Sequence, residues 1–139
     1  MCGGINQGFT VIAFERLCVV CKKKTNHLKA LKFSRLSNII ILSLQRFDFT
    51  RNIKNEIAVN IDEIIDLHDF IDKDFCNNNS VYHLNSLLCH EGFIDFGHYF
   101  SIIKLNGQDK WFKFDDKNIS EIDFNNIDLK KIYALIYRK

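Results

Sequence analysis

The chain has no proline and only one tryptophan and one methionine among its 139 residues. We attribute the missing proline, together with the many Asn, Ile and Lys residues, to biased codon usage, and it excludes no function. An excess of one charge is also missing, because the formal net charge is +2. This balance favours neither a nucleic acid nor a membrane surface as a partner. What remains is 47% hydrophobic with 13 phenylalanines, which is enough apolar material for one domain with its own core.

Long apolar runs and a leader sequence are lacking too. The longest apolar stretch, residues 39–42, is far too short to span a bilayer. The first residues carry no basic segment followed by an apolar one, so we identify no signal peptide. Five cysteines are an odd number, and without a secretory signal they are better interpreted as reduced thiols or metal ligands than as disulfides. We therefore expect an intracellular protein of the cytoplasm, the nucleus or both.

The pattern of apolar residues predicts a mostly β chain with minor helix and no internal repeat. Residues 30–49 are typical of two strands, and the second, over 38–47, is apolar on both faces as a central strand should be. Residues 62–75 are acidic and weakly helical or looped, and residues 76–80 and 91–96 are expected to be loops. Further strands are expected at 57–61, 82–89 and 132–137.

A hairpin is the clearest local prediction. Asn106-Gly107 lies between segments of high strand propensity, and this pair suits a type I′ turn because both central residues need positive φ. If the pair forms a two-residue loop, His98 lies opposite Asp115 on the same face. A carboxylate beside a histidine fixes its tautomer and stabilises the imidazolium, as the base of a Cys or Ser nucleophile requires.

That pair has a plainer interpretation. A histidine opposite an aspartate can be an ordinary cross-strand polar pair, and a register slip of one residue would put His98 and Asp115 on opposite faces. The wider pattern of the chain decides between the two interpretations.

From Phe14 onward, the chain resembles the C-terminal portion of the ubiquitin-specific proteases, a family of cysteine deubiquitinases. The landmarks lie in the family's order at residues 18–21, 42–47, 52–54, 67–70, 82–84, 90–92, 97–99, 111–116 and 133–137. The resemblance implies an α+β, mostly antiparallel fold that is part of a papain-like cysteine protease. Residues 1–139 would be one partial catalytic domain, with about 14–35 as half of the fingers and about 36–139 as the palm.

The resemblance implies roles for specific residues. His98 would be the general base, Asp115 its orienting partner, and Asp116 the adjacent acidic position that shares this work in some members. Four further positions would line the channel for the C-terminal tail of ubiquitin: Phe47, Lys54, His90 and Tyr99. Phe47 is equally explained as a core residue at the end of a buried strand, and His90 as a loop histidine.

Zinc is suggested by Cys18 and Cys21, because C-x-x-C spacing lets two thiolates bind one tetrahedral ion. A structural site needs four ligands, and the family's other pair is absent unless Cys2 or His27 substitutes. The pair is therefore half a zinc site, or simply two reduced cysteines at a hairpin tip. No cofactor is expected for catalysis.

One departure from the family matters most. The box that carries the catalytic cysteine, similar to Gly-Asn-Thr-Cys, has no match in this sequence, and Cys76 and Cys89 lie in the wrong places. The helical thumb that carries this box is missing as well, so we expect a partial domain, whether through gene-model truncation, a split gene or genuine reduction, that is inactive without a Cys-bearing segment. Another chain is one candidate source of that segment. The predicted function is cysteine-type deubiquitination with ubiquitin and ubiquitinated proteins as partners. The alternatives are an inactive module that binds ubiquitin or an adaptor, and a different papain-like protease or transferase.

Overall fold

The computed structural model describes residues 12–29, 31–72, 74, 79–105 and 107–139. The chain forms two compact units, of which one comprises Met1–Leu36 with Leu67–Ser80 and the other comprises Ser37–Asp66 with Val81–Lys139. Within the described ranges, no helix is long and apolar enough to cross a bilayer.

The first unit contains an antiparallel hairpin. Strands β1 (Ile12–Leu17) and β2 (Lys24–Lys29) pair from Ile12 with Lys29 to Leu17 with Lys24. The same unit contains the 3₁₀ helix η1 (His68–Phe70) and a parallel bridge between Phe33 and Ile71. The predicted strand after residue 30 is thus wrong, since the regular strand ends at Lys29.

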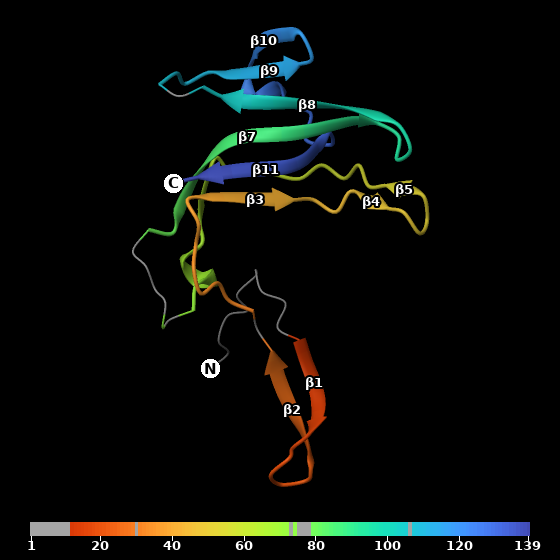
Figure 1. Ribbon diagram of the computed structural model, residues 1–139, viewed down its shortest axis with the longest axis vertical. Coiled ribbons are helices and arrows are strands. Elements are labelled where there is room, and N and C mark those ends of the chain that lie inside the picture. The colour runs from red at the N-terminus through yellow and green to blue at the C-terminus, as the bar shows by residue number, and fades with distance from the viewer. Residues whose placement is uncertain (1–11, 30, 73, 75–78, 106) are drawn as a thin grey trace. The chain divides into compact units, whose positions relative to one another are not determined.

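The second unit is a twisted antiparallel sheet (Figure 1). Its strand order is β10-β9-β8-β7-β11-β3, with β6 also paired to β7. The strands are β3 (Ile39–Ser43), β6 (Ile64–Asp66), β7 (Val81–Gly92), β8 (Gly97–Lys104), β9 (Trp111–Asp115), β10 (Asn118–Ile122) and β11 (Ile132–Arg138). A small separate ribbon pairs β4 (Phe47–Asp48) with β5 (Ile53–Lys54), and a 3₁₀ helix η3 (Phe124–Asn126) precedes β11.

The core of this sheet lies on β7, β8 and β11. Its most buried large side chains are Tyr82, Leu87, Cys89, Ile102, Ile132 and Tyr137. On β7 the buried positions change from even to odd numbers between Leu84 and Leu87, where the pairing with β11 shifts. A bulge of this kind inserts one residue and re-aims the side chains that follow it.

The mostly antiparallel β fold is confirmed, whereas the described residues contain no α-helix, so the helical part of the α+β prediction is not found there. Strands over 82–89 and 132–137 are confirmed, and β7 is longer than predicted. The predicted strand at 57–61 is wrong, because those residues form no strand. Most of the predicted loop at 76–80 and the turn residue Asn106 lie outside the described residues.

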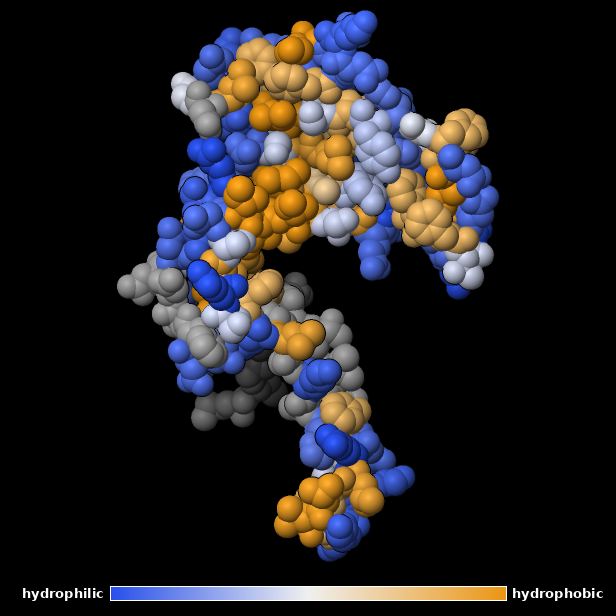
Figure 2. Space-filling view, viewed as in Figure 1, coloured by the Kyte–Doolittle hydropathy of each residue, from blue (hydrophilic) through white to orange (hydrophobic). Residues whose placement is uncertain are grey.

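The prediction that residues 38–47 form a central strand is also wrong. In the described part of the chain, β3 pairs on one side only, with β11, and lies at the edge of the sheet. Ile39 and Ile41 are 57% and 65% exposed. Apolar residues on both faces of a strand indicate its hydrophobicity and not its number of strand neighbours. Figure 2 shows the resulting apolar patch over this edge of the sheet.

Candidate functional site

The β8–β9 hairpin forms as predicted, but with a different register. Strand pairing ends at Lys104 with Trp111, so Leu105 and residues 107–110 lie outside the ladder. The N–H of Gln108 donates to the carbonyl of Leu105, and Gly107 has a φ of +77°. The observed register differs by two residues from the predicted one. Because side chains alternate with a period of two, this shift keeps His98 and Asp115 on the same face, although they now meet diagonally.

His98 and Asp115 form a close pair. His98 Nε2 lies 2.5 Å from Asp115 Oδ1, and the two side chains are 45% and 28% exposed. The hydrogen bond to Asp115 raises the pKa of His98 above its ordinary value, and Asp116 adds to the effect. The predicted register was thus wrong by two residues, but the predicted contact between His98 and Asp115 is present.

Lys113 is a third member that sequence reasoning missed. Its Nζ lies 2.6 Å from Asp115 Oδ2 and 4.3 Å from the centroid of the Phe100 ring. Lys113 and His98 both lower the pKa of Asp115 through hydrogen bonds, and Lys113 has the larger effect. The position of Lys113 two residues before Asp115 places both on one face of β9, and this alternation was the available signal.

Asp116 has a backbone role as well as a charge. It follows β9 in the turn to β10 and has a φ of +51°, a left-handed conformation that aspartate tolerates better than most residues. Ligand atoms of His98, Asp115 and Asp116 all lie within 4.8 Å of one another. The three residues named as catalytic are thus brought together at one place.

A cluster of aromatic rings lies at the same end of the sheet. The His90 ring lies 5.1 Å from that of Phe47 and 4.6 Å from that of Tyr99, between centroids. Tyr133 closes the cluster at 5.6 Å from Phe47 and 5.7 Å from Tyr99. We call these four residues the aromatic slot. Tyr133 was missed as a site residue, because its placement depends on a shift in the pairing of β11 with β7 that no residue pattern announces.

His90 is a strand residue and not a loop residue. It is 4% exposed, and its Nδ1 is buried without a hydrogen-bond partner. Burial lowers the pKa of His90, and the nearby Lys54 charge lowers it further, so the ring is neutral at physiological pH. Burial of a polar atom without a partner costs free energy, so the position of this ring is set by its packing against neighbouring rings.

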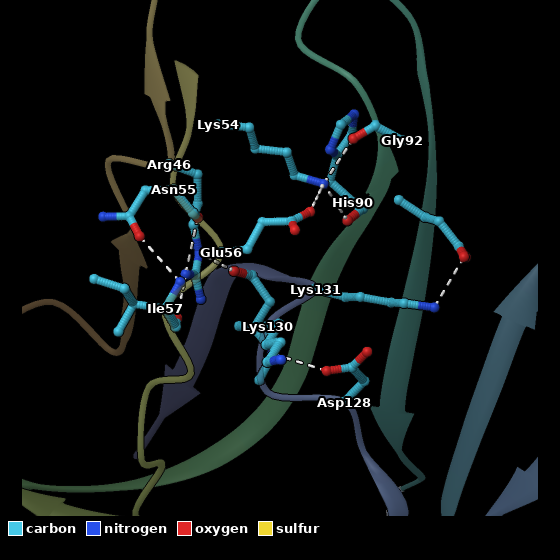
Figure 3. A network of polar contacts seen from close by, with 12 residues as sticks. Arg46, Lys54, Asn55, Glu56, Ile57, His90, Gly92, Asp128, Lys130 and Lys131 are labelled. Carbon is cyan, nitrogen blue, oxygen red and sulfur yellow. Dashed lines mark hydrogen bonds and ion pairs between the residues drawn. The ribbon is translucent and has the colours of Figure 1, made fainter.

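Two cationic side chains beside the slot, Arg46 and Lys54, donate hydrogen bonds to backbone carbonyls (Figure 3). Arg46 is 5% exposed and donates from Nε to the Ile132 carbonyl at 2.9 Å. Its two terminal nitrogens donate to the carbonyls of Asn55, Ile57 and Leu129. Lys54 Nζ lies 2.8 Å from the Gly92 carbonyl oxygen and 3.4 Å from that of His90. These contacts tie the β4–β5 ribbon to β7 and β11.

Cys18 and Cys21 lie at the tip of the β1–β2 hairpin in the other unit. The Lys22 N–H donates to the Cys18 carbonyl, and the Cys18 N–H donates to the Lys23 carbonyl. Hydrogen bonds from the backbone of Cys21 and Val20 lower the pKa of the Cys18 thiol, which favours the thiolate that metals bind. Among the described residues, the group of three potential metal ligands is His98, Asp115 and Asp116, and it includes neither cysteine. Cys2 lies outside the described residues.

Cys89 is unsuited to act as a nucleophile. It is 1% exposed, and burial raises the pKa of its thiol to about 12. A thiol with such a pKa is protonated at neutral pH and inaccessible to substrate. Cys76 lies outside the described residues.

Comparison with known families decides the identity of this chain. The family described as "Ubiquitin carboxyl-terminal hydrolase" matches residues 5–137. The chain belongs to the ubiquitin carboxyl-terminal hydrolase family. This is the deubiquitinase family that the sequence landmarks indicated.

A family member that this chain matches is much longer than the chain itself. Ubiquitin carboxyl-terminal hydrolase 5 of Arabidopsis thaliana is 28% identical over 125 residues, which cover 88% of this chain and 14% of the relative. The chain thus matches about a seventh of that protein's length.

Solved structures of the family share the fold. The SAGA Ubp8/Sgf11/Sus1/Sgf73 DUB module bound to ubiquitin aldehyde matches with a TM-score of 0.71 at 21% identity, over 94% of this chain and 31% of that chain. The yeast SAGA DUB module with a mutant Sgf73 matches with a TM-score of 0.64 at 23% identity, over 83% of this chain and 27% of that chain. The chain therefore has part of the fold of these larger proteins.

Proposed function

We propose that this chain supplies the general base and the ubiquitin-tail slot of a cysteine-type deubiquitinase. The observation that carries the proposal is the His98–Asp115 pair, with 2.5 Å between Nε2 and Oδ1. Because Asp115 accepts from Nε2, Nδ1 of His98 is the nitrogen left to take a proton from a thiol. His98 and Tyr99 are consecutive residues of β8, so the base and the aromatic slot lie at the same end of this strand.

In this function, a cysteine on a Cys-bearing segment attacks the carbonyl carbon of the last glycine of ubiquitin. His98 takes the thiol proton and returns it to the departing lysine amine, which leaves a thioester. Water then attacks the thioester, gives one proton to His98 and releases the ubiquitin carboxylate and the thiol. Asp115 stabilises the imidazolium at each stage.

The slot suits the end of ubiquitin. That tail is extended and ends in two glycines, so a narrow channel with the aromatic slot as one wall would exclude larger side chains by steric contact. Ubiquitin and ubiquitinated proteins are thus the proposed partners, together with a chain that supplies the thumb.

The test joins the chain to a Cys-bearing thumb segment and measures hydrolysis of a fluorogenic ubiquitin C-terminal amide. We expect His98→Ala to lower kcat by about 100-fold or more, because general base catalysis contributes that much. Lys110→Met, which removes an exposed ion pair with Glu121, is the control and should leave kcat unchanged. Equal turnover of the His98→Ala and parent proteins would refute the proposed base.

A second candidate function is an inactive module that binds ubiquitin. It is favoured by the positions of the described cysteines. The Cys89 thiol is buried, and Cys18 and Cys21 belong to the unit that does not contain His98. Calorimetric binding of ubiquitin without an adduct to electrophile-tipped ubiquitin would support it. An adduct on the unmodified chain would contradict it.

We also propose that Cys18 and Cys21 form half of a zinc site in a fingers segment over about 14–35, with the palm over about 36–139. The lowered pKa of Cys18 and the C-x-x-C spacing support this role. Native mass spectrometry with added zinc tests it, and equal zinc content after Cys21→Ser would refute it.

A further inference from the structure

The loop between β7 and β8 has little apolar contact to hold it. Residues 93–96 close the hairpin, and the Phe93 N–H donates to the Phe96 carbonyl at 2.9 Å. Phe93 and Phe96 are 69% and 72% exposed, with their rings 5.4 Å apart. We call residues 93–96 the β7–β8 loop. Side chains exposed to this extent contribute little to fixing a loop.

Both ends of this loop require glycine. Gly92 has a φ of +105°, which side-chain-bearing residues rarely adopt. Gly97 has an ordinary φ, but a Cβ there would lie 2.1 Å from His90 Nε2. The loop therefore begins at a conformationally free residue, and it ends against the ring of a slot residue.

Lys54 reaches the base of the loop from β5. Its side chain is 11% exposed, and its Nζ lies 2.8 Å from the Gly92 carbonyl oxygen and 3.4 Å from that of His90. Glu56 Oε1 forms an ion pair with the same ammonium group, at 3.3 Å from Lys54 Nζ. An ammonium group has three N–H donors, so these acceptors use all of them. Figure 3 shows the ammonium group pointing at these carbonyls.

The same contact involves the aromatic slot. Lys54 pairs directly with Phe47 across the β4–β5 ribbon, and the Phe47 ring packs on the edge of His90. The carbonyl of His90 thus accepts a hydrogen bond from Lys54, and the His90 ring packs against the rings of Phe47 and Tyr99. A cavity of about 930 Å³ lies next to this junction and is lined by residues of the β4–β5 ribbon, by the loop, and by Asp128, Lys130 and Lys131. With open space beside it, the loop needs an anchor.

We propose that Lys54 is a positioning residue that fixes the β7–β8 loop, and with it the His90 wall of the slot, by binding the carbonyls of His90 and Gly92. The link from the loop to ubiquitin rests on the proposed function, whereas the anchor itself does not. Lys54 acts on the loop through the backbone carbonyls, so a variant without a cationic hydrogen-bond donor at this position loses the anchor while the sheet remains folded.

The first experiment measures amide hydrogen exchange of the whole chain. In Lys54→Met, exchange of the Phe93 amide should rise about tenfold, because hydrogen bonds from a charged donor are lost. Core amides of β8 and β9 should be unchanged, and Lys54→Arg should restore protection. Lys131→Met is the matched control, since Lys131 Nζ pairs with the Glu91 side chain at 2.9 Å, whereas the Lys131 backbone carbonyl, which accepts from the His90 N–H, is kept in the variant. Unchanged exchange at Phe93, or an equal rise in Lys131→Met, would overturn the anchor.

A second measurement needs no variant that might misfold. The anchor predicts a slowly exchanging ammonium signal for Lys54 in nitrogen-detected NMR of the unaltered chain. An ammonium signal that exchanges as fast as those of exposed lysines would overturn it.

Ubiquitin titration then tests the positioning role. Lys54→Met should weaken ubiquitin binding about tenfold, and Lys54→Arg should restore it. If exchange rises but affinity does not change, the positioning role is overturned. If the unaltered chain does not bind ubiquitin, the proposed function fails, and the exchange and NMR results still decide the anchor.

Discussion

At the scale of single residues, His98 depends on three charged neighbours that have opposing effects. Asp115 and Asp116 raise its pKa, and Lys113 lowers it. Lys113 also shares the carboxylate of Asp115, so the acidic partner of His98 is held from both of its oxygens. Sequence reasoning identified the pair from a turn signal, but it could not weigh Lys113 without the register.

The pH dependence of the pair follows from these neighbours. Since the folded-state pKa of His98 is raised, its protonated form contributes to stability below the ordinary histidine pKa. That contribution is lost as pH rises through the folded-state pKa. Asp115→Asn should lower the pKa of His98, measured by NMR titration of the ring, because the main cause of the raised value is removed. Asp116→Asn is the control and should lower it less, and an unchanged pKa in Asp115→Asn would contradict the pairing.

Arg46 offers a second prediction at this scale. Its guanidinium is buried and satisfies carbonyls of two separate segments, 55–57 and 129–132. Arg46→Met should lower the free energy of unfolding by about 3 kcal/mol, because several buried carbonyls lose their donors. Chemical denaturation measures this loss.

The exposed Arg51, whose Nε lies 3.7 Å from Asp48, provides the comparison. Arg51→Met should cost less than about 0.5 kcal/mol. Equal losses in Arg46→Met and Arg51→Met would contradict the role given to Arg46.

At the scale of elements, the strands with clear alternation or strong turn signals were predictable. The strands β7, β8, β9 and β11 all fall in this class, and they contain the core and the His98–Asp115 pair. Three strands were not predictable from the sequence: the two-residue strands β4 and β5 and the edge strand β10. Short or exposed strands have no clear periodic pattern of apolar residues. The pairing shifts on β7 and β11 were invisible for a similar reason, since a bulge depends on the partner strand.

Strand β3 carries the prediction at this scale. Ile41 is 65% exposed, so Ile41→Lys should change the free energy of unfolding by less than about 1 kcal/mol. It should also reduce self-association in light scattering, because a lysine on an edge strand opposes edge-to-edge pairing. Leu135→Ala on the neighbouring β11, where the residue is 5% exposed, should cost about 2–5 kcal/mol. A comparable loss in Ile41→Lys would show that the face of β3 is covered.

At the scale of the whole molecule, the proposed site belongs to one unit. His98, Asp115 and the aromatic slot all lie within Ser37–Asp66 and Val81–Lys139, whereas Cys18 and Cys21 lie in the other unit. The order of family landmarks along the sequence predicted the family, and the family match confirms it. Grouping Leu67–Ser80 with the N-terminal segment was beyond sequence reasoning, because it depends on long-range contacts such as the Phe33–Ile71 bridge.

The most direct test of the central claim is an NMR titration of the isotope-labelled chain with ubiquitin and with ubiquitin that lacks its last two glycines. We predict that intact ubiquitin shifts the resonances of Phe47, His90 and Tyr99, and that the shortened form binds at least about tenfold more weakly. Equal binding of the two forms, or shifts confined to residues away from the slot, would contradict the claim that this sheet receives the ubiquitin tail beside His98.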